Sequence, residues 1–207
     1  MYVIGISGSP RKNGNTSFLV RQALEEIKNQ GIDTELIELS DYRIADCRGC
    51  EGCRQTYACV IRDDMQKIYP LLEKADAVIL GSPTYFYDVT ALMKAFLDRL
   101  YCYEVFDDDD RSVWMSVNEA LGGKLAAVIS VCEQKKAQDT GYAAKTMRLT
   151  LESLGYRVTD CAEVIDLFKK TEAREDSAAI LEVKSLGHRL AKTLLLKESI
   201  RLKHSET

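Results

Sequence analysis

The sequence contains no apolar run near the roughly 20 residues that a transmembrane helix needs. Its first residues lack the positively charged segment that opens a secretory signal peptide. A net charge of -4, with no basic stripe, gives no electrostatic footprint for nucleic acid. The only histidines, His188 and His204, lie near the end of the chain and are poor catalytic candidates. We therefore expect a cytoplasmic protein that has neither a membrane nor a nucleic-acid partner.

The chain does contain seven cysteines among its 207 residues. Four of them fall within thirteen residues, at spacings of two, two and five: Cys47, Cys50, Cys53 and Cys59. In a reducing compartment, cysteines are more often free thiols and metal ligands than disulfides. Four thiolates suit zinc or an iron-sulfur cluster, and the tight spacing favours a 4Fe-4S cluster over a zinc site. Unmetallated thiols are the third alternative.

Apolar segments of strand character alternate along the chain with segments of helical period. Strands are predicted at residues 2–7, 34–39, 77–81, 124–131 and 157–165. Helices are predicted at residues 19–30, 63–73, 92–100, 142–154 and 172–196. This order predicts one α/β domain over residues 1–207, a doubly wound five-stranded parallel sheet of order 2-1-3-4-5 with helices on both faces. The cysteine-rich loop covers residues 42–62, and residues 103–123 are too polar and irregular for the sheet.

The loop after the first predicted strand is rich in groups that bind phosphate. It precedes a helix, whose free N-terminal amides and dipole favour an anion. The loop is not a Walker loop, because Asn15 stands where the Walker lysine would be. It is not a dinucleotide fingerprint either, because Gly5-Ile6-Ser7-Gly8 has the wrong glycine spacing. A plain strand-to-helix turn is the alternative. The candidate phosphate ligands are Ser9, Arg11, Asn13, Gly14, Asn15 and Thr16.

Two further loops end strands at the same edge of the predicted sheet. The first and third strands flank the point where the strand order reverses, and ligands bind there in doubly wound sheets. The loop after the third strand offers flat aromatic faces to a planar ring, and the loop after the fourth offers amides to its edge. Packing of the aromatic rings under the sheet, and burial of Cys132 as a small apolar side chain, are the alternatives. The candidate residues are Pro83, Thr84, Tyr85, Phe86, Ser130, Cys132 and Glu133.

These motifs together resemble the NADPH-dependent FMN reductase family of flavodoxin-like proteins. The resemblance spans residues 2 to about 165 and is carried by Gly8-Ser9-Pro10-Arg11, Gly14-Asn15-Thr16, Ser82-Pro83-Thr84-Tyr85 and residues 92–99. The cysteine motif before Asp63-Asp64-Met65 resembles the iron-sulfur flavoprotein branch of this family.

That resemblance implies one FMN and one 4Fe-4S cluster per subunit. The first loop would contact the FMN phosphate, residues 83–86 would line the isoalloxazine, and the four cysteines would bind iron. It also implies a homodimer or homotetramer. We expect residues 103–123, which carry Trp114, at a subunit interface, with a flap over the flavin as the alternative.

Three functions are consistent with these features. The first is electron transfer through FMN and a cluster, from a ferredoxin-like protein or NAD(P)H to an acceptor. The second is a cluster-free flavin reductase of quinones, azo or nitro compounds, and the third is a non-enzymatic FMN-binding carrier or regulator. No catalytic side chain is required in any of them, because the flavin carries the chemistry.

Overall fold

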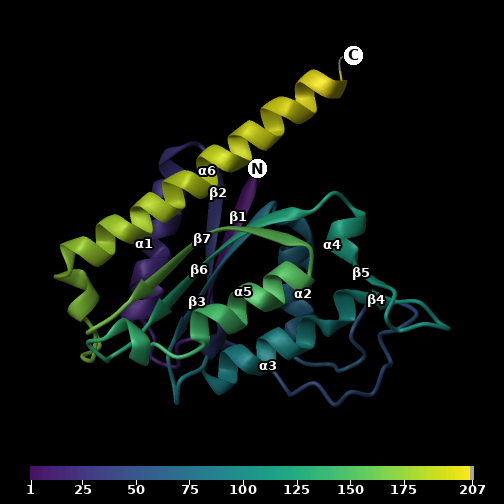
Figure 1. The fold of residues 1–207 in the computed structure, drawn as a ribbon, viewed down its shortest axis with the longest axis horizontal. Helices are drawn as coiled ribbons and strands as arrows, with labels where there is room; N and C mark the ends of the chain where they lie inside the picture. The colour runs from purple at the N-terminus through teal and green to yellow at the C-terminus, as the bar shows by residue number, and fades with distance from the viewer. Residues whose placement is uncertain (206–207) are drawn as a thin grey trace.

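The computed structural model describes residues 1–205 and is built around a five-stranded parallel sheet (Figure 1). The strands are β1 (Tyr2–Ser7), β2 (Asp33–Glu38), β3 (Ala77–Pro83), β6 (Lys124–Val131) and β7 (Tyr156–Val164). They are ordered β2-β1-β3-β6-β7, and each neighbouring pair is parallel. This is the predicted flavodoxin-like order, since β6 and β7 are the fourth and fifth strands of the sheet.

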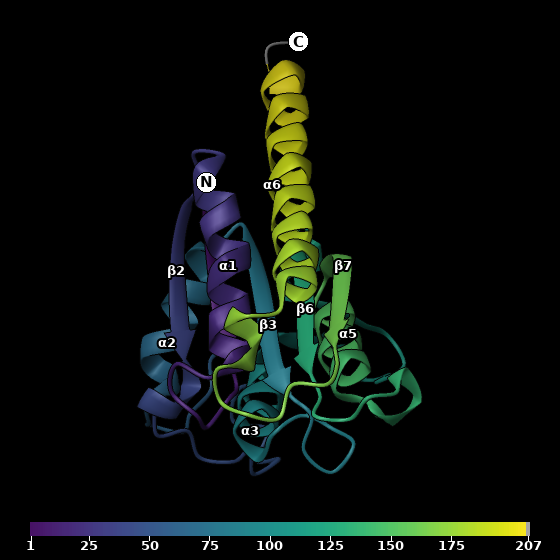
Figure 2. The same cartoon turned by 90° about the vertical axis from the view of Figure 1, so that its left-hand side faces the viewer.

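Helices cover both faces of the sheet. They are α1 (Asn15–Asn29), α2 (Met65–Lys74), α3 (Ala91–Arg99), α5 (Ala143–Ser153) and α6 (Ser177–Ser205). Helices α1 and α6 pack on one face, which is turned toward the viewer in Figure 2, and α2, α3 and α5 pack on the other. None of the helices in the described part of the chain is both long and apolar enough to cross a membrane.

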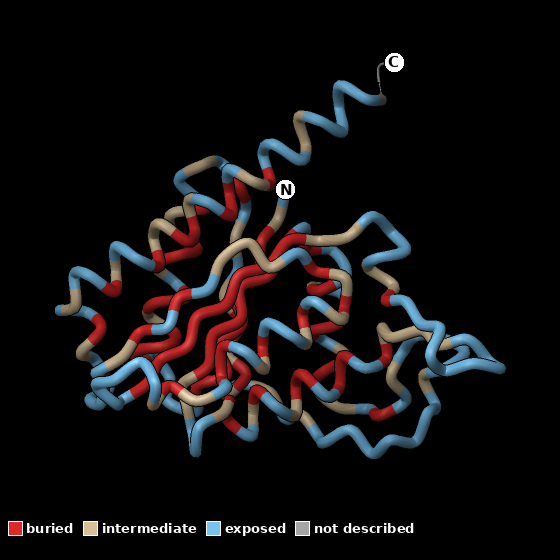
Figure 3. The backbone as a smooth tube through the Cα atoms, in the orientation of Figure 1, coloured by how far each residue is buried: buried red, intermediate tan, exposed pale blue. Residues whose placement is uncertain are grey.

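Each face of the sheet has its own apolar core. Along β1, Ile4 and Ile6 contribute to the core beneath α2, α3 and α5, whereas Val3 contributes to the core beneath α1 and α6. Successive side chains of a strand point to opposite faces, so a strand covered on both sides must be apolar throughout. Figure 3 shows the result as a band of buried backbone through the middle of the molecule. This explains why the strands appear in the sequence as continuous apolar runs.

Residues 103–123 lie outside the main sheet, as predicted, but they are more regular than the sequence suggested. They begin at the end of η2 (Leu100–Tyr103) and contain an antiparallel pair, β4 (Glu104–Phe106) and β5 (Trp114–Ser116), and the short α4 (Val117–Ala120). The pair is held by side-chain contacts across it, with the ring centroids of Phe106 and Trp114 6.3 Å apart. Residues of β4 are half-buried, and Trp114 and Met115 of β5 are exposed, so this ribbon needs no continuous apolar run like those of the main sheet.

The last helix differs from its prediction at both ends. The prediction placed it at residues 172–196, but α6 runs from Ser177 to Ser205, and Glu172–Arg174 forms a separate 3-10 turn. The apolar pattern ends near Leu194, which is the last buried leucine of the helix. The backbone continues as helix beyond it because Leu, Lys, Glu and Arg are all strong helix formers. The end of α6 therefore extends past the sheet, as Figures 1 and 2 show.

Candidate functional site

The loop between β1 and α1 presents a helix N-terminus to the carboxyl edge of the sheet. Gly14 caps α1 with extended backbone, and it has no side chain that could occupy the free amides of the first turn. A β-carbon on Gly14 would lie 2.9 Å from the Arg11 carbonyl oxygen, so the turn requires glycine at this position. Asn13, just before it, has a φ of 53°, a left-handed conformation that asparagine tolerates. This geometry fits the predicted anion site.

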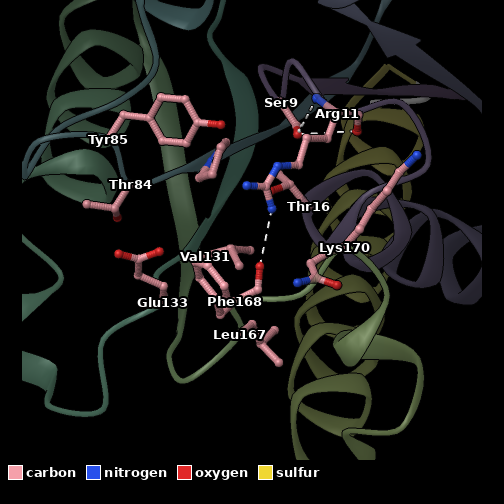
Figure 4. Close-up of a pocket in the computed structure, with 12 residues that line it drawn as sticks. Ser9, Arg11, Thr16, Thr84, Tyr85, Val131, Glu133, Leu167, Phe168 and Lys170 are labelled. Atoms are coloured by element: carbon pink, nitrogen blue, oxygen red, sulfur yellow. Dashed lines mark hydrogen bonds between the residues drawn. The ribbon is translucent and has the colours of Figure 1, made fainter.

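A pocket of about 60 Å³ opens beside this loop, where the carboxyl ends of β1, β3 and β6 meet the segment after β7 (Figure 4). Eight of the predicted site residues line it: Ser9, Arg11, Asn15, Thr16, Pro83, Thr84, Tyr85 and Glu133. Their loops are far apart in the sequence but adjacent in space, because the parallel strands all end at one edge.

The other predicted ligands do not line the pocket. Asn13 and Gly14 shape the turn, and Phe86 lies on the exposed loop tip beside it. Ser130 and Cys132 do not line the pocket, whereas Val131, itself only 4% exposed, and the exposed Glu133 do. This alternation follows from the pleat of β6, which directs every second side chain away from the pocket. The interpretation of Cys132 as a small buried side chain agrees with its position.

Four residues of the pocket were missed by the sequence analysis. They are Val131, which ends β6, and Leu167, Phe168 and Lys170 from the segment after β7. Ligands of doubly wound sheets bind beyond the carboxyl ends of the strands. Their position after the fifth strand could therefore have indicated Leu167, Phe168 and Lys170 as candidates. No recognisable motif marks the segment after β7.

Side chains of the phosphate loop hold that missed segment in place. Arg11 reaches across the pocket and donates from Nη1 to the Phe168 carbonyl oxygen at 3.2 Å, as Figure 4 shows. Asn15 donates from Nδ2 to the Lys169 carbonyl oxygen at 2.7 Å and accepts from the Ala173 amide at 3.2 Å. The Asn15 side chain is thus engaged with backbone. Its contribution to an anion site comes from its own N–H group at the start of α1.

The loop after β3 projects its aromatic side chains into solvent at the mouth of the pocket. Phe86 is fully exposed, at 101% of its reference area, and Tyr85 and Tyr87 are also exposed. Phe86 and Tyr87 both have positive φ, 47° and 67°, in a turn closed by paired hydrogen bonds between Tyr85 and Asp88. Such backbone is unfavourable for bulky residues and tends to occur at functional sites. The rings therefore do not pack under the sheet.

The backbone of this aromatic turn is supported from the other side by Gly141. Its missing side chain makes room for Tyr87, whose carbonyl oxygen would lie 2.2 Å from a β-carbon at this position. The next residue, Tyr142, donates its amide to the same Tyr87 oxygen at 2.6 Å. The loop before α5 thus fixes the turn beside the pocket.

The four clustered cysteines lie in the long loop between β2 and α2, at the same carboxyl edge of the sheet. All four are free thiols, and they differ in burial: Cys47 and Cys50 are exposed, while Cys53 and Cys59 are half-buried against the core. Burial raises the pKa of the Cys53 thiol, and the three other thiols of the loop raise it further, so each of them lies within electrostatic reach of Cys53.

The donor set fits a cluster in type, because four thiolates on one loop are the usual ligands of 4Fe-4S iron. The sulfurs are not yet gathered around one point. Within residues 1–205, no three or more His, Cys, Asp or Glu side chains lie together closely enough to hold a metal ion.

The cysteine loop also contacts the segment around β4 and β5. Arg54 donates to Asp108 at 2.9 Å, and Arg111 donates to Glu51 at 3.1 Å. These exposed ion pairs contribute little stability. They show that the loop and residues 107–111 lie side by side, a contact that no sequence pattern indicated.

The fold and the pocket together define a flavodoxin-like protein with a pocket at the carboxyl edge of its sheet. The chain matches the NADPH-dependent FMN reductase family over residues 1–161 and belongs to that family.

Several relatives of known name are similar to this chain. An iron-sulfur flavoprotein of Methanocaldococcus jannaschii is 50% identical over 99 residues, which are 48% of this chain and 51% of that protein. An iron-sulfur flavoprotein of Methanosarcina thermophila is 40% identical over 132 residues, 63% of each chain. The chain thus spans about half to two thirds of the length of these relatives. A solved flavodoxin from the domain Archaea has a TM-score of 0.60 at 18% identity, over 94% of this chain and 99% of its own, which shows the shared fold.

Proposed function

We propose that this protein is an FMN-dependent oxidoreductase. The observation that carries the proposal is the pocket itself, where a helix N-terminus suited to phosphate and a loop of exposed aromatic rings open side by side between β1 and β3. Membership of the NADPH-dependent FMN reductase family supports the same cofactor. The names of the archaeal relatives support the iron-sulfur flavoprotein branch.

In this proposal each pocket wall binds a different part of FMN. The amides of residues 14–16, with the hydroxyls of Ser9 and Thr16 and the guanidinium of Arg11, hold the phosphate. Residues 83–86 and Glu133 lie along the isoalloxazine. FMN, when bound, accepts a hydride as an electron pair and can release the electrons singly. The protein's own part is to hold the ring at the open side of the pocket, where a donor reaches it.

We further propose that Cys47, Cys50, Cys53 and Cys59 hold a 4Fe-4S cluster, which would supply one-electron transfer. The electron donor would then be NAD(P)H or a ferredoxin-like protein. The alternative is a cluster-free reductase of quinones, azo or nitro compounds. One observation favours that alternative: the four thiols are not assembled around a single point in the described residues.

Anaerobic purification tests the cofactor proposal directly. We expect flavin absorption bands with a broad iron-sulfur shoulder, and FMN as the flavin that denaturation releases, identified by its mass. The reason is that the phosphate loop can enclose a terminal monophosphate, whereas its spacing does not fit a dinucleotide. Recovery of FAD as the sole flavin would contradict the assignment of the loop. Flavin bands without the shoulder would favour the cluster-free reductase.

Replacing Arg11 with alanine should weaken FMN binding by about 10- to 150-fold, or about 1.5–3 kcal/mol, through loss of a charge-assisted hydrogen bond to phosphate. Lys12→Ala is the matched control, because Lys12 is also exposed but pairs with Asp41, and it does not line the pocket. Fluorescence titration of the flavin-free chain with FMN measures both. Equal affinities for the two variants would remove Arg11 from the site.

We also propose that the protein is a homodimer or homotetramer with residues 103–123 at a subunit interface. Val113, Trp114 and Met115 are consecutive exposed apolar residues on β5 and just before it, and exposed apolar surface favours contact with a second surface. Sedimentation at micromolar concentration should show an oligomer, and Trp114→Glu should shift it toward the monomer. A monomeric parent chain would contradict this and leave the flap over the flavin as the better account.

A further inference from the structure

Residues 166–173, which follow β7, form the wall of the pocket next to the start of α1. Three of these residues line the pocket: Leu167, Phe168 and Lys170. The Leu167 amide donates to the Cys132 carbonyl oxygen at 3.2 Å, so the segment is joined to the loop after β6. The beginning of this wall is therefore fixed at the carboxyl edge of the sheet.

The side chain of Asn15 holds the rest of the segment from the first position of α1. Its Nδ2 donates to the Lys169 carbonyl oxygen at 2.7 Å, and its Oδ1 accepts from the Ala173 amide at 3.2 Å. Asn15 is only 8% exposed, and both ends of its carboxamide are engaged in this way. These two contacts lie on either side of Lys170 in the sequence. Asn15 thus fixes the backbone that carries Lys170.

Lys170 is held at the pocket while its ammonium group has no partner in the protein. Within residues 1–205, this ammonium forms no ion pair and no hydrogen bond. Figure 4 shows Lys170 on the same side of the pocket as Arg11 and opposite Glu133. The neighbouring Lys169 is also exposed, but it does not line the pocket. Lys170 is therefore available to a ligand bound beside the phosphate loop.

The charges around the pocket favour a doubly charged anion at the phosphate loop. Among the described residues that line it, Arg11 and Lys170 are the cations and Glu133 is the carboxylate. The first turn of α1 contains no acidic residue that would offset the positive end of its dipole. A phosphate monoester carries a charge of about -1.5 to -2 at neutral pH. Arg11 alone would leave roughly half of that charge unbalanced.

The size of the pocket also fits a phosphate group. Its volume is about 60 Å³, whereas a site that encloses a whole small molecule has roughly 300–1,000 Å³. The space between the phosphate loop and residues 166–173 can therefore hold a group of a few atoms but not a flavin ring. The exposed aromatic loop after β3 lies at the mouth of this space. Residues 166–173 thus belong to the part of the site that encloses the phosphate.

We propose that Lys170 is a second cationic ligand of the FMN phosphate, beside Arg11, and that Asn15 is the positioning residue that holds Lys170 there. This inference rests on the proposed function, because it takes the anion to be the phosphate of FMN. It gives the Asn15 side chain a different role from that of its neighbours in the phosphate loop. The side chain holds the segment after β7, and the segment supplies the additional charge.

Titration of the flavin-free chain with FMN and with riboflavin, which has the same ring but no phosphate, tests the role of Lys170. Lys170→Gln should bind FMN about tenfold more weakly, because one charge-assisted contact is lost at an exposed position. It should bind riboflavin as the parent does. Lys169→Gln is the matched control, since it removes the same charge one residue away from a side chain outside the pocket. It should keep the parent's affinity for both flavins.

A double-mutant cycle tests the positioning role of Asn15. Asn15→Ala should weaken FMN binding about tenfold. Adding Lys170→Gln to Asn15→Ala should then weaken it by less than about twofold more, because a lysine that is no longer held at the pocket contributes little. If Asn15→Ala does not fold, Asn15→Ser takes its place in the cycle, since the shorter side chain cannot reach both backbone partners.

A parent chain that does not bind FMN would refute the proposed function and this inference with it. If the parent binds FMN and Lys170→Gln binds it equally well, the role of Lys170 is refuted while the proposed function stands. Equal weakening toward FMN and riboflavin would also refute that role, because riboflavin has no phosphate. A full tenfold effect of Lys170→Gln in the Asn15 variant would show that Asn15 does not position Lys170.

Discussion

Replacing Cys50 with alanine is expected to remove the bound iron and leave the FMN content unchanged. The substitution takes away one of the four proposed thiolate ligands of the cluster. Cys50 is exposed, so its side chain supports no packing that the variant would lose. The phosphate loop and the aromatic loop lie on other segments and should keep binding flavin. Iron and flavin assays on anaerobically purified protein give the ratio of bound iron to bound FMN.

Cys161→Ala is the matched control for this experiment. Cys161 is also an exposed free thiol, but it lies on β7, outside the cysteine loop. We expect it to retain both iron and FMN. We also expect Cys50→Ala to lose rapid reduction by a one-electron donor if the cluster is the entry point for electrons. Iron content and reduction rate equal to the parent's would show that these cysteines are not ligands, and the cluster-free reductase would become the better account.

A second large effect is expected from a single glycine between two helices. Gly187 of α6 lies against α1, and a β-carbon there would come within 2.4 Å of the Ala23 carbonyl oxygen. Because that atom belongs to the backbone of a buried helix, no side-chain rotation can relieve the clash. We expect Gly187→Val to lower the free energy of unfolding by about 2–3 kcal/mol. The better helix propensity of valine returns only a few tenths of a kcal/mol.

Urea unfolding followed by circular dichroism measures this change. Leu181→Ala is the control on the same helix, since Leu181 is 70% exposed and its loss should change stability by less than about 0.5 kcal/mol. A Gly187→Val variant as stable as the parent would mean that α6 can move away from α1 without loss. The close approach of the two helices would then have no energetic importance.

The sheet could be predicted from the sequence because its signals are local. Each strand is a continuous apolar run such as residues 77–81, and each connecting helix has a 3.6-residue apolar period. Alternating strands and helices of this length allow few topologies, and all of them bring the loops after β1, β3 and β6 to one edge. Ser9, Thr84 and Glu133 were placed near one another by this argument, and they line one pocket.

Side-chain direction at the ends of strands was harder to predict. Ser130 and Cys132 were chosen because they lie where the fourth strand ends, yet their side chains do not line the pocket, whereas those of Val131 and Glu133 do. A shift of one residue along the strand would exchange the side chains that face the pocket with those that face away from it. The sequence marks where a strand ends more reliably than it marks which side chains face a ligand.

By itself, the sequence determined the alternation of five strands with helices, the position of the loop after the first strand and the four-cysteine motif, because all three are encoded by neighbouring residues. Tertiary structure alone decided that Arg11 and Asn15 bind the segment after β7, and that the buried Arg99 donates to the Ala45 carbonyl oxygen of the cysteine loop. Arg99 stands 54 positions from Ala45, and Arg11 stands 157 positions from Phe168. Such contacts arise only when packed strands and helices bring distant backbone together, and a side chain's own neighbours in the chain carry no record of them.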